Sequence, residues 1–326
     1  MPMQVGNLNI QQASSFAAQA MACNLDLKMA SKALRANTLL SPDEWKMLDA
    51  AVVNVAKTKM GVLTMLKSNG LRRPLGGLGV ILDTWQTQSG MTEAEIGMNP
   101  SGLPEFDRLN FELAGVPIPV ISKAFMIPIR ELMASRRNNH ALDTQHIEAA
   151  TDVVLEAAEN LVVNGSSIKV GTYSIPGLLT EANINTTTAT GDWGTAANSY
   201  TSVGKGIRVL EALGYYGPYG IAVNGTQYSE TMLPSSTENY IAIRKRILDI
   251  ESVKEMVPSS KVVAGTCVIY QLEKKVIDLA EAEALKVIPW KSPNEMVIYG
   301  QIIYAMAPRV KSDQQSQSGI CEITGC

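Results

Sequence analysis

Residues 111–165 read FELAGVPIPVISKAFMIPIRELMASRRNNHALDTQHIEAATDVVLEAAENLVVNG and carry the strongest structural signals in the chain. Three prolines, Pro117, Pro119 and Pro128, interrupt the first half of this stretch. Because proline lacks a backbone N–H and fixes φ, they exclude a continuous helix and restrict strands to edge or bulged positions. The first half therefore predicts a strand, a bend and a second strand.

The second half predicts one long helix. Asp143 can cap its start and Asn164-Gly165 can end it, since glycine readily adopts the left-handed conformation that closes a helix. Apolar residues recur between these ends at spacings of three and four, as on one helix face: Ile147, Ala150, Val154, Ala157 and Leu161. At a rise of ~1.5 Å per residue this helix is about 30 Å long, which suits a structural axis.

Three segments precede this stretch. Residues 1–40 are rich in Ala, Gln, Asn and Met, and we expect an arm that becomes ordered only against a neighbour. Residues 41–70 predict a helix that begins with the capping sequence SPDE and ends at an Asn-Gly pair. Residues 71–105 are glycine-rich with short apolar alternations, and predict a long two-stranded loop whose core another subunit supplies.

Helices and strands alternate downstream. A helix that stops at Gly214 precedes a strand at 220–223, and its expected apolar face comprises Tyr200, Val203, Ile207 and Leu210. A second helix begins at Ser236 or Thr237, and a strand follows at 262–270. This order predicts an α/β unit. A strong strand at 295–309 comes next, and residues 311–326 read as a polar tail.

The composition narrows the function classes. Of 326 residues, 46% are hydrophobic and 18% are charged, a charged fraction below the ~25% usual for globular proteins. These values exclude a disordered chain and predict that partner subunits cover part of the surface. The net charge of -3 disfavours a dedicated nucleic-acid binder, and no run of apolar residues is long enough to predict a membrane span.

No catalytic or metal-binding constellation is present in the sequence. His140 and His146 match no zinc or metalloprotease spacing, and the glycine-rich segments lack the order of phosphate-binding loops. Gly204-Lys205-Gly206 is better explained by turn chemistry or backbone packing. Two of the four cysteines, Cys321 and Cys326, fall in the predicted tail. We therefore expect no enzyme activity, no cofactor and no metal.

Three segments resemble the encapsulin (linocin-like) shell proteins and the tailed-phage major capsid proteins that share their Hong Kong 97-type fold. The clearest match is residues 111–165, where that family has a proline-containing strand followed by a long helix opened by Leu-Asp-Thr. A second runs from Val203 through GIRVLEALGYYGPYGIAVNGTQYS to Ser229, and a third is LSPDEWKMLDAAV, which begins at Leu40. These matches occur in the same order as in the family.

The resemblance implies an α+β, Hong Kong 97-like capsid fold. Its parts would be a 1–40 N-terminal arm, a 41–70 N-terminal helix and a 71–105 extended loop. A peripheral domain with the long spine helix would comprise 106–197 and 286–310. The axial domain would be 198–285, and 311–326 a C-terminal tail.

The implied function is that of a phage major capsid protein, which self-assembles into the icosahedral head that encloses the genome. An encapsulin-type compartment that encloses cargo enzymes is the alternative. Encapsulins begin near residue 41, so the additional arm and the polar tail favour the capsid. The implied partners are other copies of the chain, as pentamers and hexamers of a closed shell, and decoration or portal proteins.

Packaged DNA would be contacted only non-specifically, and no membrane is involved. The location would be the virion, after assembly in the host cytoplasm. The expected subunit-contact residues are Trp45, Trp85, Arg136, Arg137, Tyr216 and Tyr219.

Overall fold

The computed structural model describes residues 46–47, 50–52, 61–88, 91, 108–137, 145–234, 241–291, 296–313 and 315–326. The chain forms two compact units. The first comprises residues 1–56, 122–153 and 285–303, and the second comprises residues 57–121, 154–284 and 304–326. Segments distant in the sequence therefore build each unit.

The predicted long helix is α5 (Gln145–Asn164). It ends at Gly165, where φ is +68° and a Cβ atom would lie 2.4 Å from the carbonyl oxygen of Ile175, so only glycine fits. Ala157 is exposed and Ala158 is buried in its place, because at 100° per residue position 158 lies nearer the centre of the apolar face. The other predicted members of that face are buried: Ile147, Ala150, Val154 and Leu161.

The prediction of strand, bend and strand is confirmed. β3 (Phe111–Pro117) and β4 (Val120–Pro128) are separated by two residues, and α4 (Ile129–Arg137) follows directly after Pro128. β4 is an edge strand of a four-stranded sheet with the order β1-β11-β12-β4. The other strands of this sheet are β1 (Arg72–Pro74), β11 (Ile277–Lys291) and β12 (Val297–Val310). β12 confirms the strand expected at 295–309.

The helix expected at 41–70 is described only in part. Residues 46–47 and 50–52 are helical, and a separate helix, α3 (Val62–Ser68), precedes the predicted Asn-Gly stop. The φ of Gly70 is +70°, which confirms that stop. Residues 1–40 lie outside the described part of the chain, so the arm stays a prediction.

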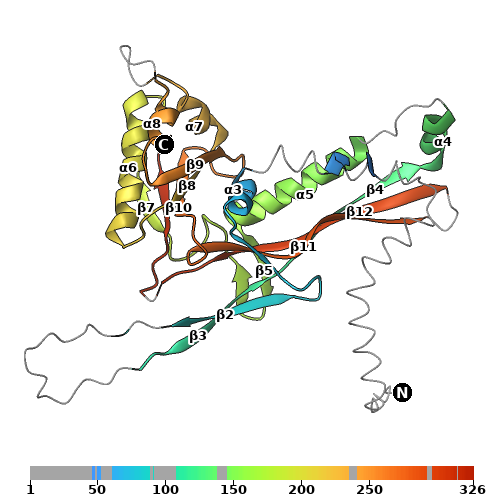
Figure 1. Ribbon diagram of the computed structural model, residues 1–326, viewed down its shortest axis with the longest axis horizontal. Coiled ribbons are helices and arrows are strands. Elements are labelled where there is room, and N and C mark those ends of the chain that lie inside the picture. The colour runs from blue at the N-terminus through green and yellow to red at the C-terminus, as the bar shows by residue number, and fades with distance from the viewer. Residues whose placement is uncertain are drawn as a thin grey trace, which may run out of the picture. The chain divides into compact units, whose positions relative to one another are not determined.

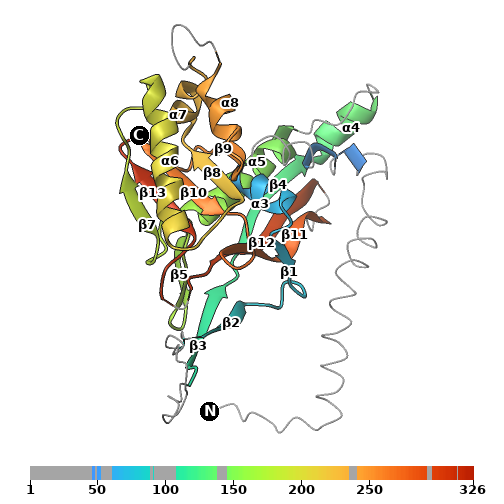
Figure 2. The ribbon, with the colours of Figure 1, turned by 60° about the vertical axis from the view of Figure 1, so that its left-hand side comes forward.

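The second unit contains a five-stranded sheet with the order β7-β13-β10-β8-β9. α6 (Ala196–Ala212) contacts β7, β13 and β10, whereas two shorter helices, α7 (Gly225–Glu230) and α8 (Ile243–Leu248), contact β9 (Figures 1 and 2). The strands are β7 (Asn185–Thr188), β8 (Tyr219–Val223), β9 (Val253–Pro258), β10 (Thr266–Gln271) and β13 (Ile320–Thr324). α6, β8 and β10 confirm the predicted helix and strands, although β10 begins at Thr266 and not at residue 262. The start expected for the second helix is wrong, because residues 241 and 242 are not helical and α8 begins at Ile243. Ser236 and Thr237 themselves lie outside the described residues.

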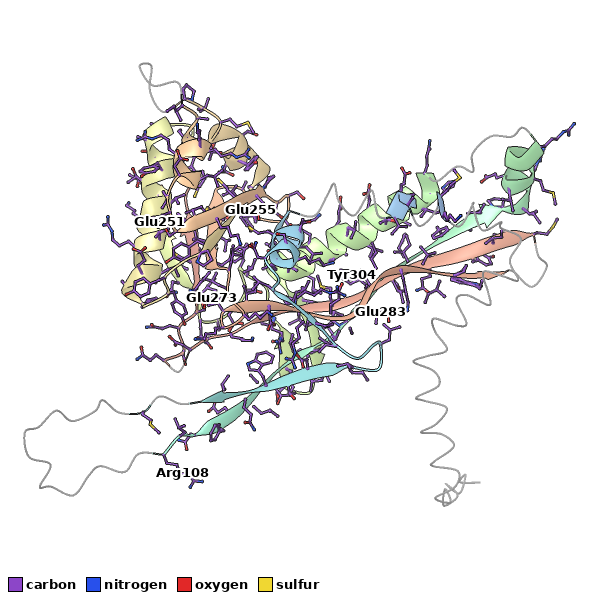
Figure 3. The ribbon with its side chains drawn as sticks, viewed as in Figure 1. Arg108, Glu251, Glu255, Glu273, Glu283 and Tyr304 are labelled. Atoms are coloured by element: carbon purple, nitrogen blue, oxygen red, sulfur yellow. The ribbon has the colours of Figure 1, made fainter. Side chains whose placement is uncertain are left out.

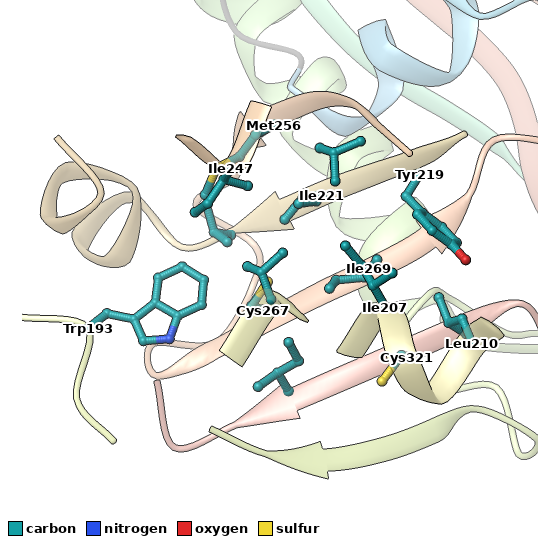
Figure 4. Packing of buried hydrophobic residues seen from close by; sticks show 14 of the residues in the cluster. Trp193, Ile207, Leu210, Tyr219, Ile221, Ile247, Met256, Cys267, Ile269 and Cys321 are labelled. Carbon is teal, nitrogen blue, oxygen red and sulfur yellow. The ribbon is translucent and has the colours of Figure 1, made fainter. Parts of the chain in front are cut away.

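A single hydrophobic core fills the space between α6 and this sheet (Figure 4). Val203, Ile207 and Leu210 are buried in it as predicted, but Tyr200 is 40% exposed at the edge of the helix face. A Cβ atom on Gly206 would lie 2.8 Å from the side chain of Ile269, so this glycine allows the close helix–sheet approach. The packing explanation for Gly206 is confirmed.

The expectation of a polar tail at 311–326 is wrong for residues 320–324. β13 lies inside the five-stranded sheet, antiparallel to β10 and parallel to β7, with Cys321 opposite Ile269 and Asn185. Ile320, Cys321 and Ile323 are fully buried. This sheet also includes residues 185–188, so it extends beyond the 198–285 segment expected to form the axial domain.

Candidate intersubunit site at the base of the hairpin

The predicted two-stranded loop is an antiparallel hairpin of β2 (Leu82–Gln88) and β3, which run side by side in Figures 1 and 2. Seven residue pairs join the strands, from Leu82 opposite Pro117 to Gln88 opposite Phe111. The returning strand therefore lies at 111–117, outside the 71–105 segment expected to form the loop. Residues 72–74 belong instead to β1 of the four-stranded sheet, because they pair with β11.

The base of the hairpin is held by a buried arginine. Arg309 on β12 binds both carboxylate oxygens of Asp278 on β11, and its Nη1 donates to Oδ2 of Asp83 on β2 at 2.7 Å. The three residues are 3%, 3% and 8% exposed. Since buried charges are tolerated only with partners, this arrangement ties β2 to the two long strands.

Two further cations complete the cluster. Lys311 Nζ lies 2.8 Å from Oδ2 of Asp278, and Arg73 Nη1 lies 3.3 Å from Oδ2 of Asp83. Arg309, Lys311 and Arg73 together carry one positive charge more than the two aspartates. We call these five residues the hairpin clamp.

Trp85 packs against the hairpin clamp. The guanidinium carbon of Arg309 lies 5.3 Å from the centre of the Trp85 ring, within cation–π distance. Trp85 is half-buried by these contacts. The side chain expected to anchor on a neighbour thus also stabilises the hairpin base of its own subunit.

A second buried carboxylate lies three residues along β11 from Asp278. Glu281 is 3% exposed and forms ion pairs with Arg72 of β1 and with Lys67 of α3. Burial lowers the pKa of Lys67, and the charge of Glu281 offsets part of this effect. Burial is the main cause, and the charge of Glu281 the second, of the raised pKa of Tyr304, which is labelled in Figure 3. The centre of the Tyr304 ring lies 4.9 Å from Lys67 Nζ. Together the two carboxylates of β11 hold α3, β1 and the hairpin.

The subunit-contact residues expected from the sequence differ in how exposed they are. Tyr216 is 68% exposed, and Arg137 is exposed on α4. Tyr219 is fully buried in the core of its own chain, where burial raises its pKa to about 12, which corrects the expectation that its side chain is a subunit contact. Arg136 is helical, but its side chain lies outside the described part of the structure, as does all of Trp45.

Local sequence patterns do not predict the hairpin clamp. Arg309 was only the last residue of an apolar strand, and its partner Asp83 is 226 positions away. The one signal was the charge itself: Arg309 is the one charged residue of the apolar strand β12. A charged residue at such a position requires a buried partner, although the sequence does not say which one.

The described residues contain neither a candidate metal site nor a candidate membrane helix. In this part of the chain no group of three or more His, Cys, Asp or Glu side chains could hold a metal ion. None of the described helices is long and apolar enough to cross a membrane.

Two sequence comparisons relate the chain to known proteins. The sequence matches a family described as a family of unknown function (DUF6260) over residues 33–322. It is 25% identical over 219 residues to the type 1 encapsulin shell protein EncA of Myxococcus xanthus (strain DK1622), an alignment that covers 67% of this chain and 70% of that protein.

Solved shell structures have the same fold. The capsid of Myoviridae phage XM1 matches with a TM-score of 0.61 and 16% identity, over 82% of this chain and 94% of that chain. The virus-like particle from Pyrococcus furiosus matches with a TM-score of 0.59 and 14% identity, over 85% and 98% respectively. The expected α+β, Hong Kong 97-like fold is confirmed.

Proposed function

The chain belongs to the DUF6260 family, and from its Hong Kong 97-type fold we propose that it is a shell subunit, the major capsid protein of a tailed bacteriophage. In this proposal, pentamers and hexamers of the chain form a closed icosahedral head that encloses the genome. The observation that carries the proposal is the extent of the fold match, which includes nearly the whole capsid chain of phage XM1. Its role is mechanical and needs no catalytic group.

The hairpin supports an intersubunit role. The hairpin clamp fixes its base, while Phe111 and Leu113, which share one face of β3, expose apolar side chains to 57% and 58%. Exposed apolar groups that gather on a projecting element are typical of a contact surface. We propose that this hairpin lies on an adjacent subunit, with Trp85, Arg137 and Tyr216 as further contact residues.

The domain roles follow from the same proposal. The five-stranded sheet with α6, α7 and α8 serves as the axial domain near the symmetry axes. α5 is the spine of the peripheral domain, residues 1–40 are an arm that binds neighbouring subunits, and portal or decoration proteins are external partners. Packaged DNA is contacted without sequence specificity, in the virion after assembly in the host cytoplasm.

An encapsulin-type compartment is the second candidate, and the sequence similarity to the Myxococcus xanthus shell protein favours it. The sequence contains two segments that the encapsulin pattern lacks, the N-terminal arm and the polar C-terminal tail, and both favoured the capsid. The argument from the polar tail is weakened, because β13, which lies in that segment, is part of a folded sheet. The forty residues that precede the SPDE helix start remain as the argument for the phage head.

The contents of particles purified from the natural source test the choice between the two. A phage head is expected to contain nuclease-resistant DNA and to co-purify with a portal protein. Particles filled with one cargo enzyme and free of protected DNA would overturn the phage assignment and support the compartment. Absence of particles would contradict both.

A further inference from the structure

A groove of about 690 Å³ opens beside the hairpin base, within the second unit. Its basic side chains outnumber its acidic ones by five to one: Arg73, Lys274, Lys275, Arg309 and Lys311 against Asp313. Trp85 and Tyr215 supply aromatic surface in the same groove. The groove thus combines positive charge with apolar surface, as expected for a site that binds an acidic peptide segment.

The internal pairing of these charges leaves the groove positive. Arg309, Lys311 and Arg73 share the carboxylates of the hairpin clamp. Asp313 is also engaged, since its Oδ1 accepts from the backbone N–H groups of Gln315 and Gln317.

Lys274 and Lys275 are exposed in the turn next to Glu273, which is labelled in Figure 3. No side-chain ion pair is found for either lysine within the described residues. They are the charges most available to a ligand.

The chain itself contains a segment of complementary charge. Residues 89–107, SGMTEAEIGMNPSGLPEFD, connect the two hairpin strands and include no lysine, arginine or histidine. Their four acidic residues are Glu93, Glu95, Glu105 and Asp107. Met91, Ile96 and Phe106 add apolar side chains that suit the aromatic surface of the groove.

We propose that this basic groove binds the acidic segment 89–107 of a second copy of the chain. The inference rests on the proposed shell function and names the acceptor of the hairpin tip. Each subunit then offers one tip and one groove, a head-to-tail contact of the kind that closes rings.

The ladder geometry favours a second copy over the subunit's own tip. Asp83 is held at the groove by Arg309, and the ladder continues from Asp83 to Gln88, about 17 Å further at 3.3 Å per residue. The groove follows β2 from the side of Arg309 as far as Thr87, so the chain leaves the ladder at Gln88 in the direction away from Arg309. For residues 89–107 to fill the groove of their own subunit, the chain would have to turn back after Gln88 and run along β2 toward Arg309.

Zero-length carbodiimide crosslinking of the full chain tests the contact. Natural-abundance and heavy-nitrogen-labelled subunits are mixed before assembly, and crosslinked peptides are identified by mass spectrometry. We expect amide links from Glu93 or Glu95 to Lys274 or Lys275, with pairs of mixed isotope composition. If every crosslinked pair carried the same isotope on both peptides, the contact would lie within one subunit, and the proposal would be overturned. The absence of these crosslinks would also overturn it.

Charge reversal provides a second test. Lys274→Glu with Lys275→Glu, or Glu93→Lys with Glu95→Lys, should each lower the shell yield about tenfold, because like charges then face each other. Combining all four substitutions should restore the yield. The control variant, Lys169→Glu with Lys254→Glu, reverses two exposed lysines outside the groove and should assemble normally.

The outcomes separate the two proposals. Shells that form without the crosslink and tolerate the reversals overturn the groove while the shell function stands. Crosslinks between subunits that never form shells overturn the shell function and leave the contact. A lysine reversal that only removes co-purified nucleic acid, with no effect of the Glu93 and Glu95 reversal, would identify a polyanion site and overturn the peptide site.

Discussion

At Arg309, a guanidinium with 3% exposure binds two aspartates from two other strands, so one side chain joins β12, β11 and the hairpin. Such a buried pair adds little net stability compared with apolar packing, but removing one partner leaves uncompensated buried charge. Its role is therefore to fix geometry: the hairpin leaves the subunit in one defined direction.

Replacing Arg309 tests this role. Arg309→Ala should lower the free energy of unfolding by about 3–5 kcal/mol, since Asp83 and Asp278 lose their main partner. The matched variant Arg73→Ala removes a half-exposed cation from the same cluster and should cost less than about 1 kcal/mol. Denaturant unfolding of the dissociated subunit measures both. Equal effects would show that burial of the guanidinium is not what holds the hairpin.

Glu159 gives a second residue-scale prediction. This buried carboxylate on α5 accepts the backbone N–H groups of Val62 at 2.9 Å and Leu63 at 3.1 Å, at the start of α3. Glu159→Gln keeps only one acceptor oxygen and should lower the free energy of unfolding by about 1–3 kcal/mol. The exposed neighbour Glu156 serves as control, because Glu156→Gln should change stability by under about 1 kcal/mol. Equal losses would contradict the capping role of Glu159.

At the scale of elements, sequence patterns predicted what local periodicity determines. The apolar spacing of three and four predicted α5 and α6, the prolines predicted β3 and β4 as separate strands, and a glycine ended each helix. β13 was missed because the polar stretch SDQQSQSG precedes its short run ICEIT, and because it pairs with β10 and β7, which are distant in sequence. The hairpin clamp was missed for the same reason, since pairing across the fold is not a local property.

Cysteine reactivity tests the position of β13. Burial raises the pKa of Cys321 to about 12 and that of Cys267 well above its usual value. Both thiols should therefore resist a maleimide reagent at neutral pH in the native state and react after unfolding. Gln315→Cys, an exposed site in the same C-terminal segment, should react at once. Rapid labelling of native Cys321 would show that residues 320–324 are detached from the sheet.

The raised pKa of Cys321 also predicts how stability depends on pH. The folded state holds this proton more tightly than the unfolded state, where the pKa is near 9.0. Unfolding therefore releases a proton between about pH 9 and pH 12, and stability should fall as the pH rises through this window. Cys321→Ser should reduce that slope.

At the scale of the whole molecule, we expect residues 1–40 to become ordered only against neighbouring subunits. This segment, rich in Ala, Gln, Asn and Met, is expected to have no core of its own, so it should be dispensable for subunit folding but needed for a stable shell. A truncation that begins at Leu39 should keep its helical circular dichroism and give few intact particles in sedimentation. Robust shells from that truncation would instead support the compartment reading.

Cryo-electron microscopy of the full-length chain, expressed alone and purified, tests the central claim most directly. We expect closed icosahedral shells of pentamers and hexamers, in which each hairpin extends from its clamped base onto an adjacent copy. Only monomers or dimers over a range of salt and protein concentrations would contradict the shell function. Shells in which this hairpin packs solely on its own subunit would contradict its intersubunit role.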